Sequence, residues 1–244
     1  MVLSEGTTAC QLCLRNKYGN IISIFIMLLF ILSGSSCNLS TNNNSDIQTA
    51  KIDKLPYYNT ADFDAEWIDE NNPAYAQIHT IEPFAFTNQE GNIINNDSLN
   101  GKIYVANFFF TICSGICPKM VNNLQVLQKT FANNNQIKLV SFSVMPWVDS
   151  VARLKAYGEN HNINSSKWFL LTGNKEKIYE LGRKSFFAEK GLGLQKDNNE
   201  FLHTESMLLI DKKGRIRGIY NATQVTDIER VTDDIKVLMK EKEL

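Results

Sequence analysis

The stretch Ile103-Tyr-Val-Ala-Asn-Phe-Phe-Phe-Thr-Ile-Cys113-Ser-Gly-Ile-Cys117-Pro118 decides the fold and places the chemistry. It opens with an apolar, β-branched and aromatic run, which predicts a buried central strand. Proline is favoured in the first turn of a helix, so we expect a helix to open at Cys117-Pro118. Two thiols then lie between the end of a strand and the positive end of a helix dipole, which favours thiolate. This position indicates redox chemistry or a soft metal.

The rest of the domain predicts alternating strands and helices. A hairpin around Gly91 precedes the central strand, further strands are expected at 137–144 and 168–171, and a second hairpin at 207–220. Helices are expected at 119–133, from a cap at Asp149 through Tyr157, at 175–187, and from a capping box at Thr226 to about 241. This order predicts an α/β fold with a central mixed sheet flanked by helices and an N-terminal hairpin. With paired cysteines after the first central strand, it matches the thioredoxin-like fold.

Residues 1–36 have the pattern of a signal peptide. Arg15 and Lys17 precede an apolar run of about 12 residues, whereas a membrane span needs about 20. Small residues then lead to Cys37, which resembles the processing site of a bacterial lipoprotein. We therefore expect an exported, periplasm-facing lipoprotein, acylated at Cys37 and tethered through a polar segment at 37–55, with one folded domain at 56–244. The alternative is an uncleaved signal anchor.

Composition narrows the function further. The net charge is −1 and no cluster of lysines and arginines stands out, which argues against a nucleic-acid partner. Cys10 and Cys13 precede the apolar run and Cys37 is the expected lipid site, so Cys113 and Cys117 are the pair left in the domain. A disulfide between them would close a tiny loop and stabilise little, even in an oxidising compartment, so chemistry explains the pair better.

A metal site needs a further ligand beside the cysteines. Their C-x-x-x-C spacing suits two sulfurs that converge on one metal ion, and it does not exclude a reversible disulfide. Of three histidines, His161 is expected at a solvated helix end and His79 at or near the surface. His203 precedes the late strand that returns beside the cysteine loop in this fold, so it is the predicted third ligand. Two thiolates and an imidazole suit Cu(I) and Cu(II), whereas zinc, the alternative, usually takes four ligands in structural sites.

These features resemble the Sco/SenC family of membrane-tethered copper proteins. The resemblance covers roughly 81–244 and rests on the Phe-rich strand with Cys113-x-x-x-Cys117-Pro118, on Ser141-Phe-Ser-Val, and on His203 followed by Leu209-Ile-Asp211. It implies that Cys113, Cys117 and His203 bind copper. Met145 stands where the family commonly has an aspartate, and Leu202 replaces the aspartate that usually precedes the histidine, which removes an acidic neighbour of His203.

The resemblance also implies a function and partners. It implies a chaperone that delivers copper to the binuclear copper centre of a respiratory oxidase, through the copper-accepting subunit of cytochrome c oxidase. A second hypothesis is a thiol–disulfide oxidoreductase that reduces the cysteines of that centre, forms a Cys113–Cys117 disulfide and depends on a thiol reductant. His203 discriminates the two, because a dithiol reductant needs only the cysteines. A peroxidase is a weaker third hypothesis, since this combination of cysteines and histidine is not the pattern of those enzymes.

Overall fold

The computed structural model describes residues 54–188 and 205–241, so the predictions for residues 1–53 and for His203 lie outside the described residues. Its main sheet has seven strands in the order β4-β3-β7-β6-β5-β8-β9. Their bounds are β3 Ala85–Asn88, β4 Ile93–Asn95, β5 Ile103–Phe109, β6 Ile137–Ser143, β7 Trp168–Thr172, β8 Ser206–Ile210 and β9 Ile216–Asn221. The strands β5, β6 and β7 are parallel and the other pairs antiparallel, which confirms the predicted mixed sheet and the hairpin before it. A separate two-stranded sheet pairs β1 (Tyr57–Tyr58) with β2 (Ala65–Glu66).

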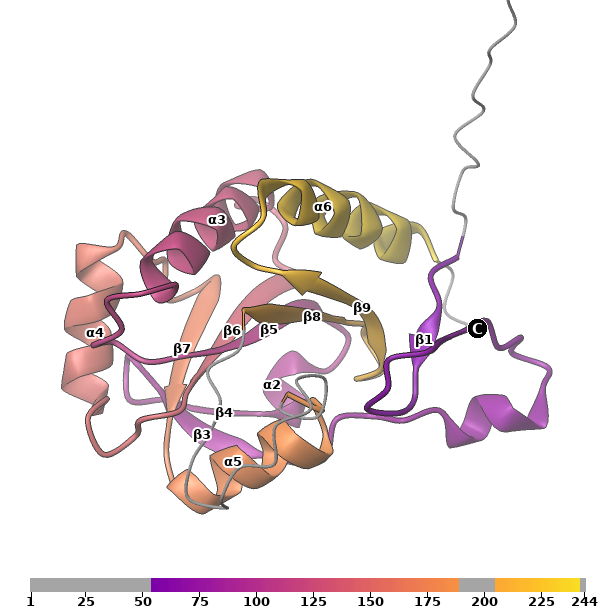
Figure 1. Cartoon of the computed structure of the whole chain (residues 1–244), viewed down its shortest axis with the longest axis horizontal. Coiled ribbons are helices and arrows are strands. Elements are labelled where there is room, and N and C mark those ends of the chain that lie inside the picture. Colours follow the sequence, from indigo (N-terminus) through magenta and orange to yellow (C-terminus); the bar gives the residue numbers. More distant parts are fainter. Residues whose placement is uncertain (1–53, 189–204, 242–244) are drawn as a thin grey trace, which may run out of the picture. The chain divides into compact units, whose positions relative to one another are not determined.

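Helices cover both faces of the main sheet (Figure 1). One layer contains α3 (Cys117–Thr130), α4 (Val151–Asn160) and α6 (Val225–Lys240), and the other contains the short α2 (Asn96–Leu99) and α5 (Lys175–Lys184). A 3₁₀ turn, η1, spans Pro73–Gln77. Every residue of β5 is buried, and its side chains alternate between the two layers: Val105 and Phe109 pack with α3, and Ala106 and Phe108 with α5. The predicted central strand is therefore confirmed.

The start of one helix differs from the sequence prediction. Ser150, and not Asp149, caps α4, because the Ser150 side chain accepts a hydrogen bond from the backbone N–H of Arg153. Asp149 is fully buried and accepts hydrogen bonds from Thr111 and Ser143 instead. An aspartate beside a serine offers two possible caps, and only the tertiary contacts choose between them.

The later helices also differ at their ends. The expected capping box at Thr226 is wrong: α6 is preceded by Gln224 without a side-chain cap, and the Asp227 carboxylate accepts from the Asn221 backbone N–H at 2.6 Å. The helix α5 ends at Lys184, short of the predicted 187, and Phe187 has a φ of 52°, which no helix accommodates. Within residues 54–188 and 205–241, no helix combines the length and apolarity needed to cross a bilayer.

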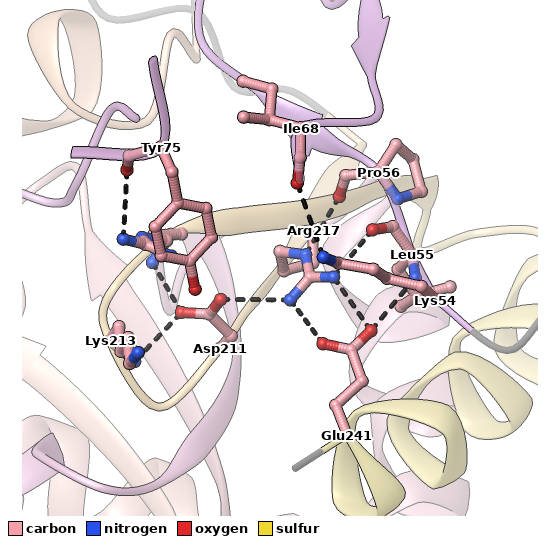
Figure 2. A network of polar contacts seen from close by, with 10 residues as sticks. Lys54, Leu55, Pro56, Ile68, Tyr75, Asp211, Lys213, Arg217 and Glu241 are labelled. Carbon is pink, nitrogen blue, oxygen red and sulfur yellow. Dashed lines mark hydrogen bonds and ion pairs between the residues drawn. The ribbon is translucent and has the colours of Figure 1, made fainter. Parts of the chain in front are cut away.

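A buried arginine joins both ends of the described domain (Figure 2). The Arg217 side chain on β9 is 2% exposed and donates to the Glu241 carboxylate at 2.8 and 2.9 Å and to Asp211 at 3.2 Å. It also donates to the backbone carbonyls of Leu55 at 2.7 Å and Pro56 at 3.0 Å. Burial acts to lower the pKa of Arg217, but the Glu241 carboxylate raises it above the ordinary value. The guanidinium thus holds together the segment at Leu55 and Pro56, the β8–β9 turn and the end of α6.

We expect Arg217→Met to lower the free energy of unfolding by about 3–5 kcal/mol, because it leaves two largely buried carboxylates without their cation. Urea unfolding followed by circular dichroism measures the change. Arg230→Met is the matched control: its pairing with Asp227 is exposed at the arginine (60%), so the loss should be about 1 kcal/mol or less. Equal losses in the two variants would contradict this role for Arg217.

Candidate metal centre

The two cysteines lie where β5 ends and α3 begins. Cys113 is in the connecting loop and is partly exposed, whereas Cys117 is the first residue of α3 and is 1% exposed; both are thiols. The residue before the helix, Ile116, provides no side-chain cap. Instead, the backbone N–H groups of Gly115, Ile116 and Cys117 hydrogen-bond to the Cys113 sulfur. This sulfur therefore occupies the position that a capping oxygen usually takes, where negative charge is stabilised.

Because of this geometry, the two thiols have different pKa values. Burial acts to raise the pKa of Cys113, but hydrogen bonds from the backbone N–H and side chain of Cys117 and from the Gly115 and Ile116 N–H groups together lower it below the ordinary value. Burial raises the pKa of Cys117 to about 12. A hydrogen bond with the Phe110 backbone acts to lower this pKa, whereas the hydrogen bond to Cys113 raises it further. Cys113 is thus the accessible sulfur and the better nucleophile, and Cys117 is a buried proton donor to it.

A buried carboxylate holds the cysteine loop in place. Asp149, 0% exposed, accepts from the Thr111 backbone N–H at 3.1 Å and hydroxyl at 2.5 Å, and from the Ser143 hydroxyl at 2.6 Å. Arg153 donates to the Thr111 hydroxyl at 2.8 Å and lies 4.0 Å from Asp149. Because Thr111 follows β5 and Ser143 ends β6, these hydrogen bonds fasten together the two loops at the carboxyl edge of the sheet.

Tyr157 of α4 packs against the buried cluster that contains Cys117 and Phe109. Its ring lies 5.7 Å from that of Phe109, the last residue of β5. Burial raises the pKa of Tyr157 above the ordinary value, and the charges of Cys117, Cys113 and Asp149 raise it further. The phenol therefore stays protonated at neutral pH, next to the site without adding charge to it.

Neither histidine within the described residues joins the cysteines. The His79 Nε2 atom lies 2.9 Å from the Ser185 carbonyl oxygen, and its ring lies 4.6 Å from that of Phe187. His161 caps the end of α4, with its ring 4.3 Å from Tyr157. Across 54–188 and 205–241, no three His, Cys, Asp or Glu side chains come close enough to hold a metal ion. The described part of the site thus supplies two sulfur donors, and the third ligand, His203, stays a prediction.

Sequence reasoning missed the residues that support the cysteine loop. Thr111, Ser143 and Asp149 form one buried cluster, although Asp149 is 38 residues from Thr111 along the chain. A signal was available: hydroxyl residues stand at or just after the ends of two strands that were expected to be neighbours. An acidic residue shortly after the second strand could then have been assigned to them.

Comparison with known proteins establishes the family. Residues 72–240 match the family model SCO1/SenC. The chain belongs to the SCO1/SenC family. The SCO1 protein homolog of Bacillus subtilis (strain 168) is 33% identical over 162 residues, which are 65% of this chain and 82% of that protein. This similarity confirms the family that the cysteine and histidine motifs predict.

Solved structures of family members confirm the fold. The SCO1/SenC family lipoprotein from Bacillus anthracis str. Ames is 34% identical, with a TM-score of 0.59 over 66% of this chain and 96% of that chain. BsSco, described as a Sco family cytochrome c oxidase assembly protein with a disulfide switch, is 32% identical, with a TM-score of 0.58 over 68% of this chain and 96% of that chain. The thioredoxin-like arrangement predicted from the order of elements is therefore shared with these Sco proteins.

The difference in thiol acidity makes a prediction about alkylation. In the reduced, folded protein, iodoacetamide should modify Cys113 at least about 100-fold faster than Cys117, since the thiolate is the nucleophile. The Cys113 rate should rise with pH and reach half its maximum below the ordinary pKa of a cysteine thiol, because that pKa is lowered. Peptide mass spectrometry after timed quenching measures both rates. In urea the two should converge, and faster modification of Cys117 in the folded protein would contradict the assignment.

Proposed function

We propose that this chain is a membrane-tethered chaperone that delivers copper to the binuclear copper centre of a respiratory cytochrome c oxidase. The observation that carries the proposal is the pair of thiols held at the sheet edge in a member of the SCO1/SenC family. BsSco is described as belonging to a family of cytochrome c oxidase assembly proteins, and ScoI from Bradyrhizobium japonicum, 23% identical to this chain, was solved with copper bound. The copper-accepting subunit of the oxidase is the proposed partner.

The donor atoms support copper as the cargo. Cys113 and Cys117 offer two sulfurs, and His203 is the proposed third ligand through an imidazole nitrogen, a set suited to Cu(I) and also to Cu(II). Because burial raises the pKa of Cys117, this thiol is protonated at neutral pH and must lose its proton to bind metal. Copper affinity should therefore increase with pH. The partial exposure of Cys113 leaves one side of the site open to an incoming ligand from a partner.

The acidity difference between the thiols also favours a second function, reduction of disulfides. The Cys113 thiolate would attack one sulfur of a target disulfide, and the other target sulfur would leave as a thiolate. Cys117, after losing its proton, would then displace the target from Cys113, so that a Cys113–Cys117 disulfide and a reduced target dithiol result. Two electrons pass to the target, and an external thiol reductant must restore the pair. The cysteines of the oxidase copper centre are the proposed target.

The role of His203 separates these functions. We expect His203→Ala to weaken copper binding by the reduced protein at least about tenfold, or about 1.4 kcal/mol, and to change the charge-transfer absorption of the Cu(II) form. The His203→Ala variant should still reduce a small disulfide at the wild-type rate. His161→Ala is the matched control and should bind copper as the wild type does, and the oxidised protein should bind little. Wild-type affinity and spectrum in His203→Ala would favour the oxidoreductase.

The membrane tether is tested at Cys37. We propose that acylation of Cys37 anchors the mature protein, with 37–55 as a spacer to the domain at 56–244; the Bacillus anthracis relative is described as a lipoprotein. Cys37→Ser should abolish incorporation of a labelled fatty acid and block processing of the precursor, because the acylated thiol is lost. Cys10→Ser is the control. Continued labelling of Cys37→Ser would overturn the lipoprotein proposal in favour of an uncleaved anchor.

A further inference from the structure

Two large apolar side chains are exposed in the loops that follow β5 and β6. Ile112, next to Cys113, is 49% exposed, and Trp147, in the loop after β6, is 60% exposed. The strands β5 and β6 are parallel and pair Phe109 with Ser143, so these two loops leave the same edge of the sheet. The Asp149 carboxylate fastens the loops together through Thr111 and Ser143. Ile112 and Trp147 therefore lie on two joined loops at the sheet edge that also carries the accessible sulfur of Cys113.

A positively charged side chain lies near each of these two apolar residues. The Arg153 side chain is 48% exposed while its Nε atom donates to the Thr111 hydroxyl. The Lys175 Nζ atom lies 5.3 Å from the centre of the Trp147 ring, a cation–π contact that orients the indole. The carboxylate carried by these loops, Asp149, is fully buried and faces inward. Arg153 and Lys175 thus place two positive charges beside these loops, with the exposed Glu176 following Lys175 on α5, although the whole chain is close to neutral.

We propose that Ile112, Trp147, Arg153 and Lys175 form a docking surface for a protein partner that presents an apolar centre ringed by carboxylates next to its own cysteines. This inference rests on the proposed function, because transfer of either copper or electrons requires a partner sulfur to reach Cys113. A partner that reaches Cys113 must cover this edge of the sheet. Tryptophan and arginine are enriched among the residues that dominate protein interfaces, and positive side chains at the rim favour an acidic partner.

Two residues elsewhere in the domain provide matched controls, one for the exposed indole of Trp147 and one for the charge of Lys175. Trp67 lies near the small β1–β2 sheet, outside the cysteine loops, and is 67% exposed, so Trp67→Ala removes a similarly exposed indole elsewhere. Lys236 on α6 is 52% exposed, so Lys236→Glu repeats the charge change of Lys175→Glu on another helix. Lys175 is the first residue of α5, where a glutamate is favourable to the helix dipole. The Lys175→Glu variant should therefore fold normally.

The test is thiol–disulfide exchange with two disulfide-linked peptide dimers. Each peptide has a Leu-Cys-Leu centre, flanked by glutamates in one probe and by lysines in the other. The full chain is used in detergent, reduced, with Cys10, Cys13 and Cys37 changed to serine. Cys113 breaks the peptide disulfide and forms a mixed disulfide, and Cys117 then releases the second peptide, so two peptide thiols appear for each dithiol oxidised. Every rate is divided by the rate of dithiothreitol with the same probe. This division corrects for the different acidity of the peptide thiol that leaves each probe.

The acidic probe should react at least about tenfold faster than the basic one at low salt, and the preference should largely vanish at 1 M salt, where charges are screened beyond about 3 Å. Lys175→Glu should reduce the preference severalfold, Trp147→Ala should slow the acidic probe severalfold, and both control variants should match the wild type. Equal normalised rates for the two probes, or equal effects of Trp67→Ala and Trp147→Ala, would overturn the docking surface.

The outcome is separable from the proposed function. Trp147→Ala should bind copper with wild-type affinity, because the indole is not among the proposed ligands. If the wild type fails to bind copper while the acidic probe is preferred, the copper proposal fails and the docking surface stands. If copper binds normally and the probes react equally, the docking surface alone is overturned.

Discussion

The parallel pairing of β5 with β6 and of β6 with β7 is the constraint on which the site depends. Parallel strands end at one edge, so the loop that carries the cysteines and the loop that carries Trp147 must leave the sheet together. Edge position alone would not fix the loops. The buried Asp149 carboxylate does so, by accepting hydrogen bonds from Thr111 and Ser143, one from each strand end. Because the loops are fixed at this edge of the sheet, the Cys113 sulfur can stay partly exposed while the Cys117 sulfur is buried.

That difference in environment links the structure to both proposed functions. Cys113 is stabilised as a thiolate by the N–H groups of Gly115, Ile116 and Cys117 at the start of α3, while Cys117 is buried and keeps its proton. A soft metal ion can bind both sulfurs once the proton of Cys117 is lost. A target disulfide can instead react at Cys113 first and be released by Cys117. The two functions therefore share residues and differ in what else the site contains, which is why His203 is the informative ligand.

The sequence predicted those features whose signal is local. The apolar run of β5, the helix start at Cys117-Pro118 and the hairpins around Gly91 and Gly214 are confirmed, the last two with φ of 80° and 77°. The expected caps at Asp149 and Thr226 are wrong. Asp149 bonds Thr111, which lies 38 residues away, so a partner brought near by the fold replaced the local cap there. Asp227, next to Thr226, accepts from the backbone N–H of Asn221 at the end of β9. The cluster of Thr111, Ser143 and Asp149 joins residues from two strand ends, so its signal lies in the pairing of the strands and not in any local pattern.

X-ray absorption spectroscopy of the copper-loaded, reduced protein can decide whether Cys113, Cys117 and His203 bind copper, because it reports the atoms bound to the metal. We expect two sulfur atoms and one imidazole nitrogen to be bound to copper. Cys113→Ser and Cys117→Ser should each remove one sulfur, His203→Ala should remove the imidazole, and His79→Ala should change nothing. A shell of only nitrogen and oxygen atoms, or one unchanged by all three ligand substitutions, would contradict a copper site built on the cysteine loop.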